Sequence, residues 1–323
     1  MILMPVLGAV LICVAFAGLA LGSAEASLHT IFNALWQRHG HDTMLHTIIW
    51  QIRLPRVVLA AAVGASLSLG GLVFQALLRN PLAEPYILGV SGGSAIGAIL
   101  GIMAGLPSFP GISLSAFGGS IITLGLIMLM AGSRREMSRD SMLLGGVMAN
   151  AFCGAVIMFL ISMTQSSQMH HILFWLMGDL SMFQNRQLPI LLTILPCFVV
   201  IFLFARPMNL LLAGRENAAA LGVQVKKVTI TLLIITSFMV STVVCQAGLV
   251  GFVGLVVPHI FRLILGPDHR LLVPASILGG ASYLIVCDIL ARLLPSEGEM
   301  PVGIITALIG APLFIILLWR RRR

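Results

Sequence analysis

Long apolar runs, separated by short polar or basic stretches, make up most of this chain. A helix that crosses a bilayer needs about 20 mainly apolar residues, and ten runs reach or approach that length. The expected spans are 4–22, 55–78, 85–105, 112–132, 142–163, 188–205, 228–247, 249–266, 271–292 and 302–319. The pattern predicts an all-α polytopic membrane protein whose residues 1–323 form a single transmembrane domain.

The first apolar run has two interpretations. Ala24-Glu25-Ala26 resembles the small-residue cleavage site of a signal peptide. The chain start, MILMPV, carries no basic residue, however, and the run is longer than the core of a typical signal peptide. We expect a retained span.

Two polar stretches, 24–52 and 164–187, lie between the runs. They contain short amphipathic pieces such as SLHTIFNALW and HILFWLMGDL. Tryptophans such as Trp36 and Trp50 prefer the headgroup level of a membrane. We therefore expect both stretches outside the bilayer, with short helices lying on its surface.

The segment NPLAEP at 80–85 interrupts the apolar pattern after the second run. Pro81 and Pro85 each lack a backbone N–H and push the preceding residue toward an extended conformation, so no continuous helix can pass through. The chain must turn there. Three glycines then open the next run and indicate close backbone approach, namely Gly89, Gly92 and Gly93.

Composition supports a membrane protein. The chain is 59% hydrophobic and 9% charged, with a mean hydropathy of +1.05, so it has too few polar side chains to cover a globular surface. The net charge of +8 does not predict nucleic acid as a partner, because the basic residues stand between apolar runs and form no single patch. Membrane lipid is the expected surrounding.

The basic residues also predict an orientation. With the N-terminus inside, fourteen of the 19 Lys and Arg residues fall on the inner side of the ten expected spans and five on the outer side. Cytoplasmic loops carry an excess of Lys and Arg. The count predicts a multi-pass protein of the cell inner (cytoplasmic) membrane with both termini in the cytoplasm.

Cysteine and histidine do not point to a metal site. The five cysteines lie inside apolar runs without a CxxC pair and are expected to be small buried hydrophobes; they are Cys13, Cys153, Cys197, Cys245 and Cys287. Six histidines fall in expected outer segments, where contact with haem or a metal is the alternative to simple solvation; they are His29, His39, His41, His46, His170 and His171.

The chain carries no nucleotide-binding loop, because its two lysines, Lys226 and Lys227, do not follow a phosphate-cradling glycine loop. Any ATP-driven function needs another subunit. The segment 216–222, ENAAALG, predicts a short helix closed by a glycine cap between two basic-flanked spans. Such a small-residue helix fits a groove on a soluble partner, and a plain connecting helix is the alternative.

Several motifs together resemble a known family. They are RLPR, GLVFQALLRNPLAEPYILGVSGG, the glutamate-alanine-alanine-type loop at 216–222, GFVGLVVPHIFR and MPVGIITALIGAPLFIILL. The chain is similar to FecCD-type permease subunits of binding-protein-dependent ABC importers for iron-siderophores, haem and cobalamin. The resemblance implies a ten-span type II permease that forms a homodimer, sits on two ATPase subunits and receives its ligand from an external binding protein.

The resemblance also implies a function. The chain would be a transport subunit and no enzyme, would bind no cofactor of its own, and would rely on ATP and Mg²⁺ in its partners. A ferric-siderophore or similar iron chelate is the first choice of cargo, with haem and cobalamin as alternatives within the family.

The resemblance assigns roles to particular residues. Binding-protein docking falls to Arg53, Arg56 and Arg292, with headgroup anchoring as the alternative, and Asp288 stands four residues before Arg292 on one helix and can pair with it. The cytoplasmic gate falls to Asn80 and Leu82, with plain helix termination as the alternative. ATPase coupling falls to Glu216, Ala219, Leu221 and Gly222. Apart from the resemblance, the small residues Gly145, Gly146 and Asn150 on the span 142–163 are candidates to line the pathway at the dimer axis, with close packing of spans within one subunit as the alternative.

Two functions from other classes compete. Gly89-Val-Ser91-Gly92 matches a nucleophile pattern, and His259 could serve Ser91 as its base in an intramembrane serine protease. An autonomous secondary transporter would show ionisable residues at mid-span, and Asp288, near a helix end, is the sole candidate in the sequence.

Overall fold

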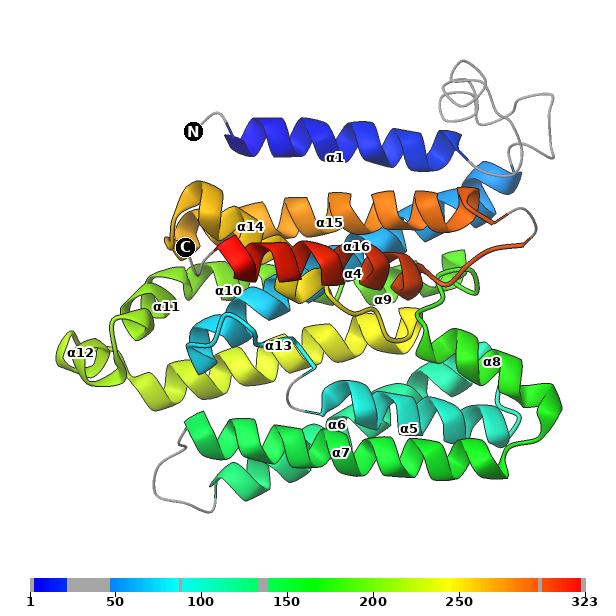
Figure 1. Ribbon diagram of the computed structural model, residues 1–323, viewed down its shortest axis with the longest axis horizontal. Helices are drawn as coiled ribbons and strands as arrows, with labels where there is room; N and C mark the ends of the chain where they lie inside the picture. The colour runs from blue at the N-terminus through cyan, green and yellow to red at the C-terminus, as the bar shows by residue number, and fades with distance from the viewer. Residues whose placement is uncertain (1–2, 22–46, 87–88, 133–138, 296–297, 321–323) are drawn as a thin grey trace.

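The computed structural model describes residues 3–21, 47–86, 89–132, 139–295 and 298–320, and these fold entirely into helices and connections (Figure 1). The α-helices are α1 (Leu3–Ala20), α4 (Leu54–Leu78), α5 (Val90–Met103), α6 (Ser113–Gly132), α7 (Arg139–Met163), α8 (Ser166–Leu176), α9 (Leu188–Leu191), α10 (Ile194–Leu203), α11 (Ala205–Leu212), α12 (Arg215–Ala220), α13 (Val225–Ala247), α14 (Val253–Leu265), α15 (His269–Leu293) and α16 (Val302–Arg320). Short π- or 3₁₀-helical turns are η1 (Ile48–Arg53), η2 (Ser108–Ile112) and η3 (Asn185–Gln187).

Seven helical stretches are long and apolar enough to cross a bilayer, and three shorter apolar helices, α5, α14 and α16, accompany them in the described part of the chain. This confirms the all-α polytopic class. Most helices run roughly along one direction (Figure 1). We use the ends of this bundle as reference points, calling the end where α4 begins the arginine end and the opposite end, which carries α12, the α12 end.

Helix α4 forms the centre of the bundle. In the stretch Ile48–Leu78, 83% of the most apolar window is buried inside the protein, against 11% for α1 and for Leu144–Met163 of α7. A helix that is apolar all round and buried belongs to the core, whereas α1 and α7 present their apolar surface to the surroundings. Helices α13, α14 and α15 pack around α4.

Glycines allow the central helices to approach closely. A methyl group on Gly64 of α4 would collide with the backbone of Gly280 of α15, and one on Gly71 would collide with the backbone of Gly254 of α14. Without a hydrophobic driving force inside a lipid bilayer, helices associate through this kind of small-residue contact. The α4–α15 and α4–α14 crossings therefore depend on the absence of side chains at these positions.

The helix limits correct several expectations. The run 188–205 is divided among α9, α10 and the start of α11, and the expected loop 206–227 is largely helical, with α11, α12 and the first turn of α13. The helix that contains α4 begins at Ile48, so part of the expected surface stretch 24–52 is its first turn. Helix α8 lies in the stretch 164–187, where a short helix was expected, but it begins at Ser166, before the HILFWLMGDL piece, and ends at Leu176.

Two expected spans start later than their apolar runs. Helix α5 begins at Val90 and not at 85, because Gly89 takes a left-handed conformation with φ 69°. Helix α14 begins at Val253 and not at 249, because Phe252 does the same with φ 66°. Helix α5 has 14 residues and α14 has 13, so each is only about 20 Å long. This length is less than the thickness of a bilayer's hydrocarbon core, which is roughly 30 Å.

Some predictions fall outside the described residues. These are the Ala24–Ala26 cleavage site, the amphipathic piece around Trp36, and four of the six histidines.

Candidate functional site: two ends of the bundle and the segments between them

Arginines meet a buried carboxylate at the arginine end. Arg56 of α4 donates from Nε to Oδ1 of Asp288 at 2.8 Å, and Nε of Arg292 lies 3.1 Å from Oδ2 of the same carboxylate. Asp288 is 0% exposed and Arg56 is 5% exposed. Two guanidinium groups compensate the buried negative charge, which alone would be costly. The expected pairing of Asp288 with Arg292 is confirmed.

The same arginines hold α1 and the α15–α16 connection in place. Arg53 donates from Nη1 to the carbonyl of Leu19 at 2.7 Å, and Arg292 donates from Nη2 to the carbonyl of Gly18 at 3.1 Å. These carbonyls belong to the last turn of α1, where a helix carries partial negative charge. Arg56 also donates from Nη1 to Oε2 of Glu299. We call Arg53, Arg56, Asp288, Arg292 and Glu299 the arginine cluster.

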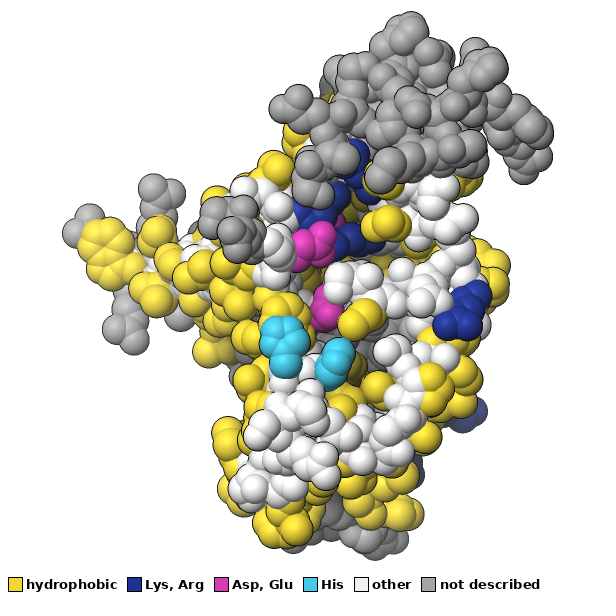
Figure 2. Space-filling view, turned by 90° about the vertical axis from the view of Figure 1, so that its right-hand side faces the viewer, with side chains coloured by type: hydrophobic (Ala, Val, Ile, Leu, Met, Phe, Trp, Pro, Cys, Tyr) yellow, Lys and Arg dark blue, Asp and Glu magenta, His cyan; other side chains and the backbone are white. Residues whose placement is uncertain are grey.

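Figure 2 looks at the arginine end and shows basic and acidic side chains in contact on this face. The structure thus brings together the three arginines expected at the outer side, and it shows each of them bound within the chain. Their docking role stays a prediction. Glu299 was not predicted, although its position shortly after Arg292 in a polar connection is a signal that sequence reasoning could have used.

The predicted gate residues lie in segment 79–89, between α4 and α5, of which the structure describes residues 79–86 and 89; this described part is irregular. Arg79 ends α4 in a left-handed conformation with φ 48°. Asn80 Oδ1 then accepts a hydrogen bond from the backbone N–H of Leu82 at 3.0 Å, a local turn typical of asparagine. The Leu82 side chain is 48% exposed near the α12 end. This geometry suits both gating and helix termination, so the gate stays a prediction.

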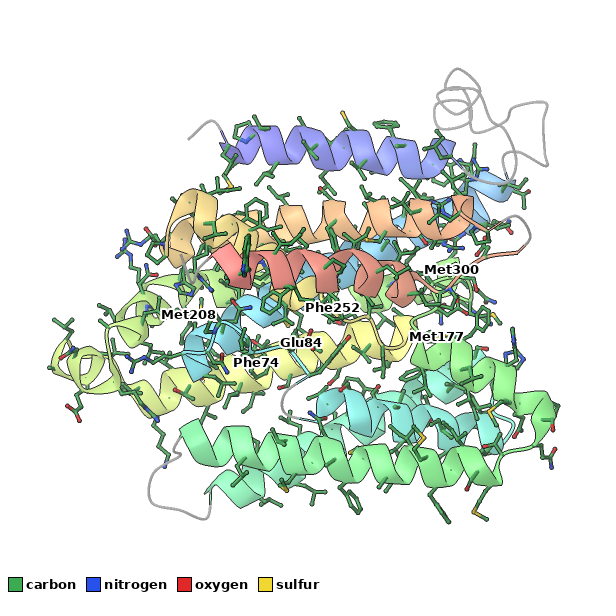
Figure 3. All side chains as sticks on the ribbon, viewed as in Figure 1. Phe74, Glu84, Met177, Met208, Phe252 and Met300 are labelled. Atoms are coloured by element: carbon green, nitrogen blue, oxygen red, sulfur yellow. The ribbon has the colours of Figure 1, made fainter. Side chains whose placement is uncertain are left out.

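Segment 79–89 is fastened to the connection 248–252 between α13 and α14. The Tyr86 hydroxyl donates to the carbonyl of Val250 at 3.0 Å and accepts from its N–H at 3.2 Å. The N–H of Phe252 donates to Oε1 of Glu84 at 3.3 Å. Figure 3 shows Glu84 and Phe252 near the middle of the bundle. Side chains thereby satisfy backbone groups that no helix satisfies, as the interior of a membrane protein requires.

Helix α12 projects at the opposite end of the molecule (Figure 1). Ala218 is buried against the rest of the chain, whereas Glu216, Ala219 and Leu221 are exposed. Gly222 follows with φ 85°, and the N–H of Val223 bonds to the carbonyl of Ala218 at 3.0 Å, which closes the helix as the sequence predicted. The exposed face combines Ala219, Leu221 and Gly222 with the carboxylate of Glu216, and it suits a groove on a partner. The coupling role stays a prediction.

Asn209 connects this region to the transmembrane helices. Its Nδ2 donates to Oδ1 of Asp268 at 2.6 Å, and its Oδ1 accepts from the backbone N–H of His269 at 2.9 Å. Asp268 is the N-cap of α15 and also accepts from the N–H of Arg270. These hydrogen bonds to the ionised form hold the pKa of Asp268 below its usual value, with the Arg270 N–H as the largest cause. These hydrogen bonds thus join α11 to the start of α15.

The expected pathway residues lie on α7. Gly145 lines a mainly apolar cavity of about 620 Å³ between α5, α6 and α7, and Gly146 is buried beside it. Asn150 donates from Nδ2 to the carbonyl of Tyr86 at 3.2 Å, so α7 contacts segment 79–89. Both pathway lining and packing remain compatible with these positions, and the lining role stays a prediction.

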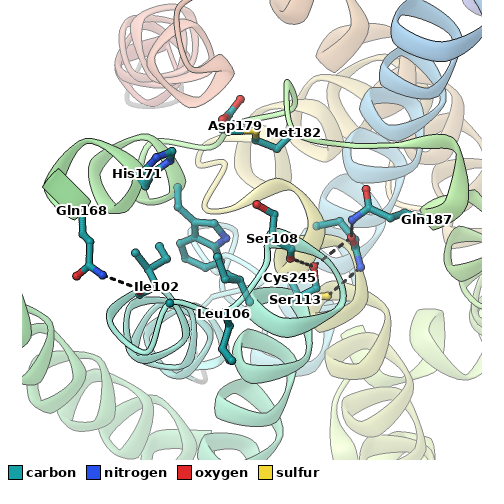
Figure 4. A pocket seen from close by; sticks show the side chains of 14 residues that line it. Ile102, Leu106, Ser108, Ser113, Gln168, His171, Asp179, Met182, Gln187 and Cys245 are labelled. Atoms are coloured by element: carbon teal, nitrogen blue, oxygen red, sulfur yellow. Dashed lines mark hydrogen bonds between the residues drawn. The ribbon is translucent and has the colours of Figure 1, made fainter.

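A second cavity, of about 260 Å³, was not predicted and opens beside α8 (Figure 4). Gln246 Oε1 accepts from Gln187 Nε2 at 3.1 Å and from Ser113 Oγ at 3.4 Å at one side of it. His171 and Asp179 lie at the other side. Amide and hydroxyl groups, one imidazole and one carboxylate share the lining of this cavity with apolar side chains such as Ile102 and Trp175.

The described cysteines and histidines differ in their surroundings. Four cysteines are buried as expected, but Cys13 is exposed, because α1 lies at the periphery with its apolar surface outward. His170 stacks on Phe174 with ring centroids 4.2 Å apart, and His171 faces the cavity. Among the residues that the structure describes, no three His, Cys, Asp or Glu side chains gather as metal ligands.

Ser91 and His259, the pair proposed for proteolysis, lie on different short helices. Ser91 is in the first turn of α5. His259 is in the second turn of α14, and its ring centroid lies 6.0 Å from that of Phe314 on α16 in an edge-on contact.

Comparisons with known sequences agree over nearly the whole chain. The profile of the FecCD transport family matches residues 10–320. The hemin transport system permease protein HmuU of Yersinia pestis is 40% identical over 313 residues, which cover 94% of this chain and 92% of that protein. The vitamin B12 import system permease protein BtuC of Klebsiella pneumoniae is 40% identical over 277 residues, 85% of this chain and 83% of that protein.

Three further similarities add to these. The ABC transporter permease protein YvrB of Bacillus subtilis, itself uncharacterized, is 38% identical over 321 residues, 95% of this chain and 90% of that protein. A solved structure described as a metal-chelate type ABC transporter in an inward-facing conformation superposes with a TM-score of 0.88 and 31% identity, over 98% of this chain and 99% of that one. PsaBC from Streptococcus pneumoniae, solved with a Fab, shares the fold alone, with a TM-score of 0.55 and 17% identity.

Proposed function

The chain belongs to the FecCD transport family, and from that premise we propose that it is the permease through which a metal chelate, first of all a ferric-siderophore, crosses the cytoplasmic membrane. The observation that carries the proposal is the agreement of fold and sequence over almost the entire length with a metal-chelate type transporter. That hemin and vitamin B12 are named for relatives of about equal identity makes haem and cobalamin the alternative cargoes.

Membership corrects the two competing functions. A permease subunit of an ABC transporter is not itself catalytic, so the intramembrane protease built on Ser91 and His259 is wrong. An ABC importer is driven by ATP-binding partners, so an autonomous secondary transporter that couples through Asp288 is wrong as well. The carboxylate of Asp288 instead compensates the positive charges of Arg56 and Arg292 in ion pairs.

In the proposed assembly, two copies of the chain form the membrane unit and two ATPase subunits bind at the α12 ends, using ATP and Mg²⁺. The exposed face of Glu216, Ala219, Leu221 and Gly222 occupies a groove on each ATPase. An external binding protein docks at the arginine end. The excess of Lys and Arg on one side of the spans supports a cytoplasmic position for the α12 end and both termini.

Movement would pass from the ATPases to the gate through contacts seen in the chain. Helix α12 follows directly after α11 in the chain. Asn209 of α11 is hydrogen-bonded to Asp268 at the start of α15. Helix α15 crosses α4 at Gly64 and Gly280, and α4 leads into segment 79–89 with Asn80 and Leu82. A change at α12 can therefore tilt the central helices and open the path beside Leu82.

Transport assays with candidate cargoes test the proposal. Proteoliposomes contain this permease with the ATPase and binding proteins of the same cell, and ferric-siderophore, haem and cobalamin are offered in turn. We expect ATP-dependent accumulation of ferric-siderophore. Accumulation of haem or cobalamin but not of ferric-siderophore would replace the proposed cargo by that compound. Transport that does not need ATP, or no transport of any cargo with any binding protein, would contradict the proposed function.

A further inference from the structure

We propose that Glu299 occupies, within the free permease, the position on Arg56 that a carboxylate of the external binding protein takes on docking. Docking is then an exchange of one carboxylate for another on the same guanidinium. This inference rests on the docking role proposed above for the arginine end, and it adds the competing group and the chemistry of the partner.

The two carboxylates on Arg56 differ in exposure. Asp288, bound at Nε over 2.8 Å, is 0% exposed and belongs to the helix core. Glu299, bound at Nη1, has a side chain that is 44% exposed. Asp288 therefore fixes where the guanidinium lies and how it is turned, whereas Glu299 covers its outward edge. With both in place Arg56 itself is only 5% exposed, and its Nη1 can donate to a partner's carboxylate in place of Glu299 only when Glu299 leaves it.

Charge explains why Glu299 must be replaced and not merely lost. The arginine cluster holds three guanidinium groups, Arg53, Arg56 and Arg292, against two carboxylates, Asp288 and Glu299, a net charge of +1. Departure of Glu299 would raise this to +2 in a partly buried place. A charge left without compensation there is costly, and arginine binds carboxylates with good geometry at either edge of its fork. The incoming group is therefore a carboxylate.

The backbone around Glu299 allows the exchange without unfolding. The N–H of Met300, the next residue, donates to the carbonyl of Ala291 at 3.1 Å, and the N–H of Val302 donates to the carbonyl of Gly178 at 2.9 Å. These bonds hold the connection to α15 and to the segment after α8. Rotation of one partly exposed side chain is then enough to uncover Arg56, so no backbone hydrogen bond has to break when the incoming carboxylate replaces Glu299.

An internal competitor weakens docking, because the apparent affinity falls in proportion to the fraction of time that Arg56 is free of Glu299. Glu299 also keeps the net charge of the cluster at +1, and not +2, when no binding protein is present. Glu299 also favours dissociation of the binding protein after it has released its cargo, because Glu299 can bind the Arg56 guanidinium again. The partner surface that fits is a protruding loop with a glutamate or aspartate at its tip.

The test compares three variants of the permease–ATPase complex in nanodiscs, with the binding protein that supports uptake in the assay above. Glu299→Gln removes the competing charge. Asp179→Asn is the matched control, because it removes one negative charge from the same face beside the second cavity without touching Arg56. Arg56→Lys keeps the charge and loses the fork. Dissociation constants are measured by surface binding, and size-exclusion profiles and melting curves confirm that each variant is folded.

We expect Glu299→Gln to tighten binding by about fivefold, the lower end of typical coupling between two sites, and Asp179→Asn to change it by less than twofold. Arg56→Lys should weaken it. Equal or weaker binding by folded Glu299→Gln, while Arg56→Lys weakens it, would overturn the exchange and leave docking intact. Unchanged binding by Arg56→Lys would instead overturn docking on this arginine, and with it the exchange.

Discussion

Arg56 and Asp288 stand 232 residues apart in the sequence and meet in an ion pair of 2.8 Å, with the carboxylate fully buried. The pair joins the first turns of α4 to the last turns of α15, and Arg292 compensates the same carboxylate. It is therefore a structural element of the arginine end as well as part of a proposed docking site.

Asp288→Asn tests the structural part. Removing one partner of a buried pair leaves the guanidinium charges of Arg56 and Arg292 short of compensation, which typically costs about 3–5 kcal/mol. We expect a clearly lower melting temperature of the detergent-solubilised protein. Asp179→Asn, at the same end of the molecule, should melt like the wild type. Equal melting of the two variants would show that the buried pair contributes little.

The glycine crossing of α4 and α15 gives a second prediction. Gly64→Ala places a methyl group against the backbone of Gly280, and overpacking of this kind costs about 1–3 kcal/mol. We expect a lower yield of folded protein and a lower melting temperature. Gly118→Ala on α6 is the matched control, because its new methyl group meets open space. A Gly64→Ala protein as stable as Gly118→Ala would mean that the helices part there at little cost.

A third prediction concerns Asn209 and pH. Asn209→Ala removes a hydrogen bond to the carboxylate of Asp268 and leaves that cap less well satisfied. Because the pKa of Asp268 in the folded protein lies below its usual 3.8, its stabilising effect is present above that value and is lost as pH falls through the folded pKa.

We therefore expect Asn209→Ala to lower the free energy of unfolding at neutral pH by about 1.5–3 kcal/mol, the typical contribution of a hydrogen bond to a charged group, and the melting temperature with it. The difference from wild type should shrink below about pH 4. A difference that stays constant across this range would show that Asn209 acts through packing and not through the ionised cap.

The exposed face of α12 gives a fourth prediction. Ala219→Arg puts a long charged side chain where we propose the ATPase groove to lie, and loss of such a small-residue contact should weaken ATPase binding about tenfold, a change of roughly 1.4 kcal/mol. Co-purification with the ATPase subunit and uptake in vesicles measure it. Gln224→Arg, also exposed near α12, is the control. Equal effects of the two would place the ATPase contact elsewhere.

How far the sequence could predict the fold depended on whether a signal was local. Pro81 and Pro85 predicted the break after α4, and the pairing of Asp288 with Arg292 followed from their spacing of four. The start of α14 could not be predicted, because Phe252, a bulky residue, takes a left-handed conformation that residue type disfavours and only its tertiary contacts maintain.

The candidate site shows the same division. The motif RLPR marked Arg56 as important, but nothing near it in the sequence indicated Asp288 or Glu299 as its partners. The joining of segment 79–89 to 248–252 through Tyr86 likewise depends on residues 164 positions apart. Contacts of this length are set by how the glycine-rich helices pack, which periodicity along one helix does not encode.

The central claim is that this chain is a membrane conduit driven by ATPase partners. The most direct measurement is cargo accumulation in proteoliposomes that contain the permease with its ATPase. It is compared with accumulation by the permease alone under an imposed proton gradient. In both cases the binding protein is added to the medium outside the vesicles. The account predicts accumulation only with the ATPase and hydrolysable ATP. Accumulation by the permease alone, driven by the gradient, would contradict it.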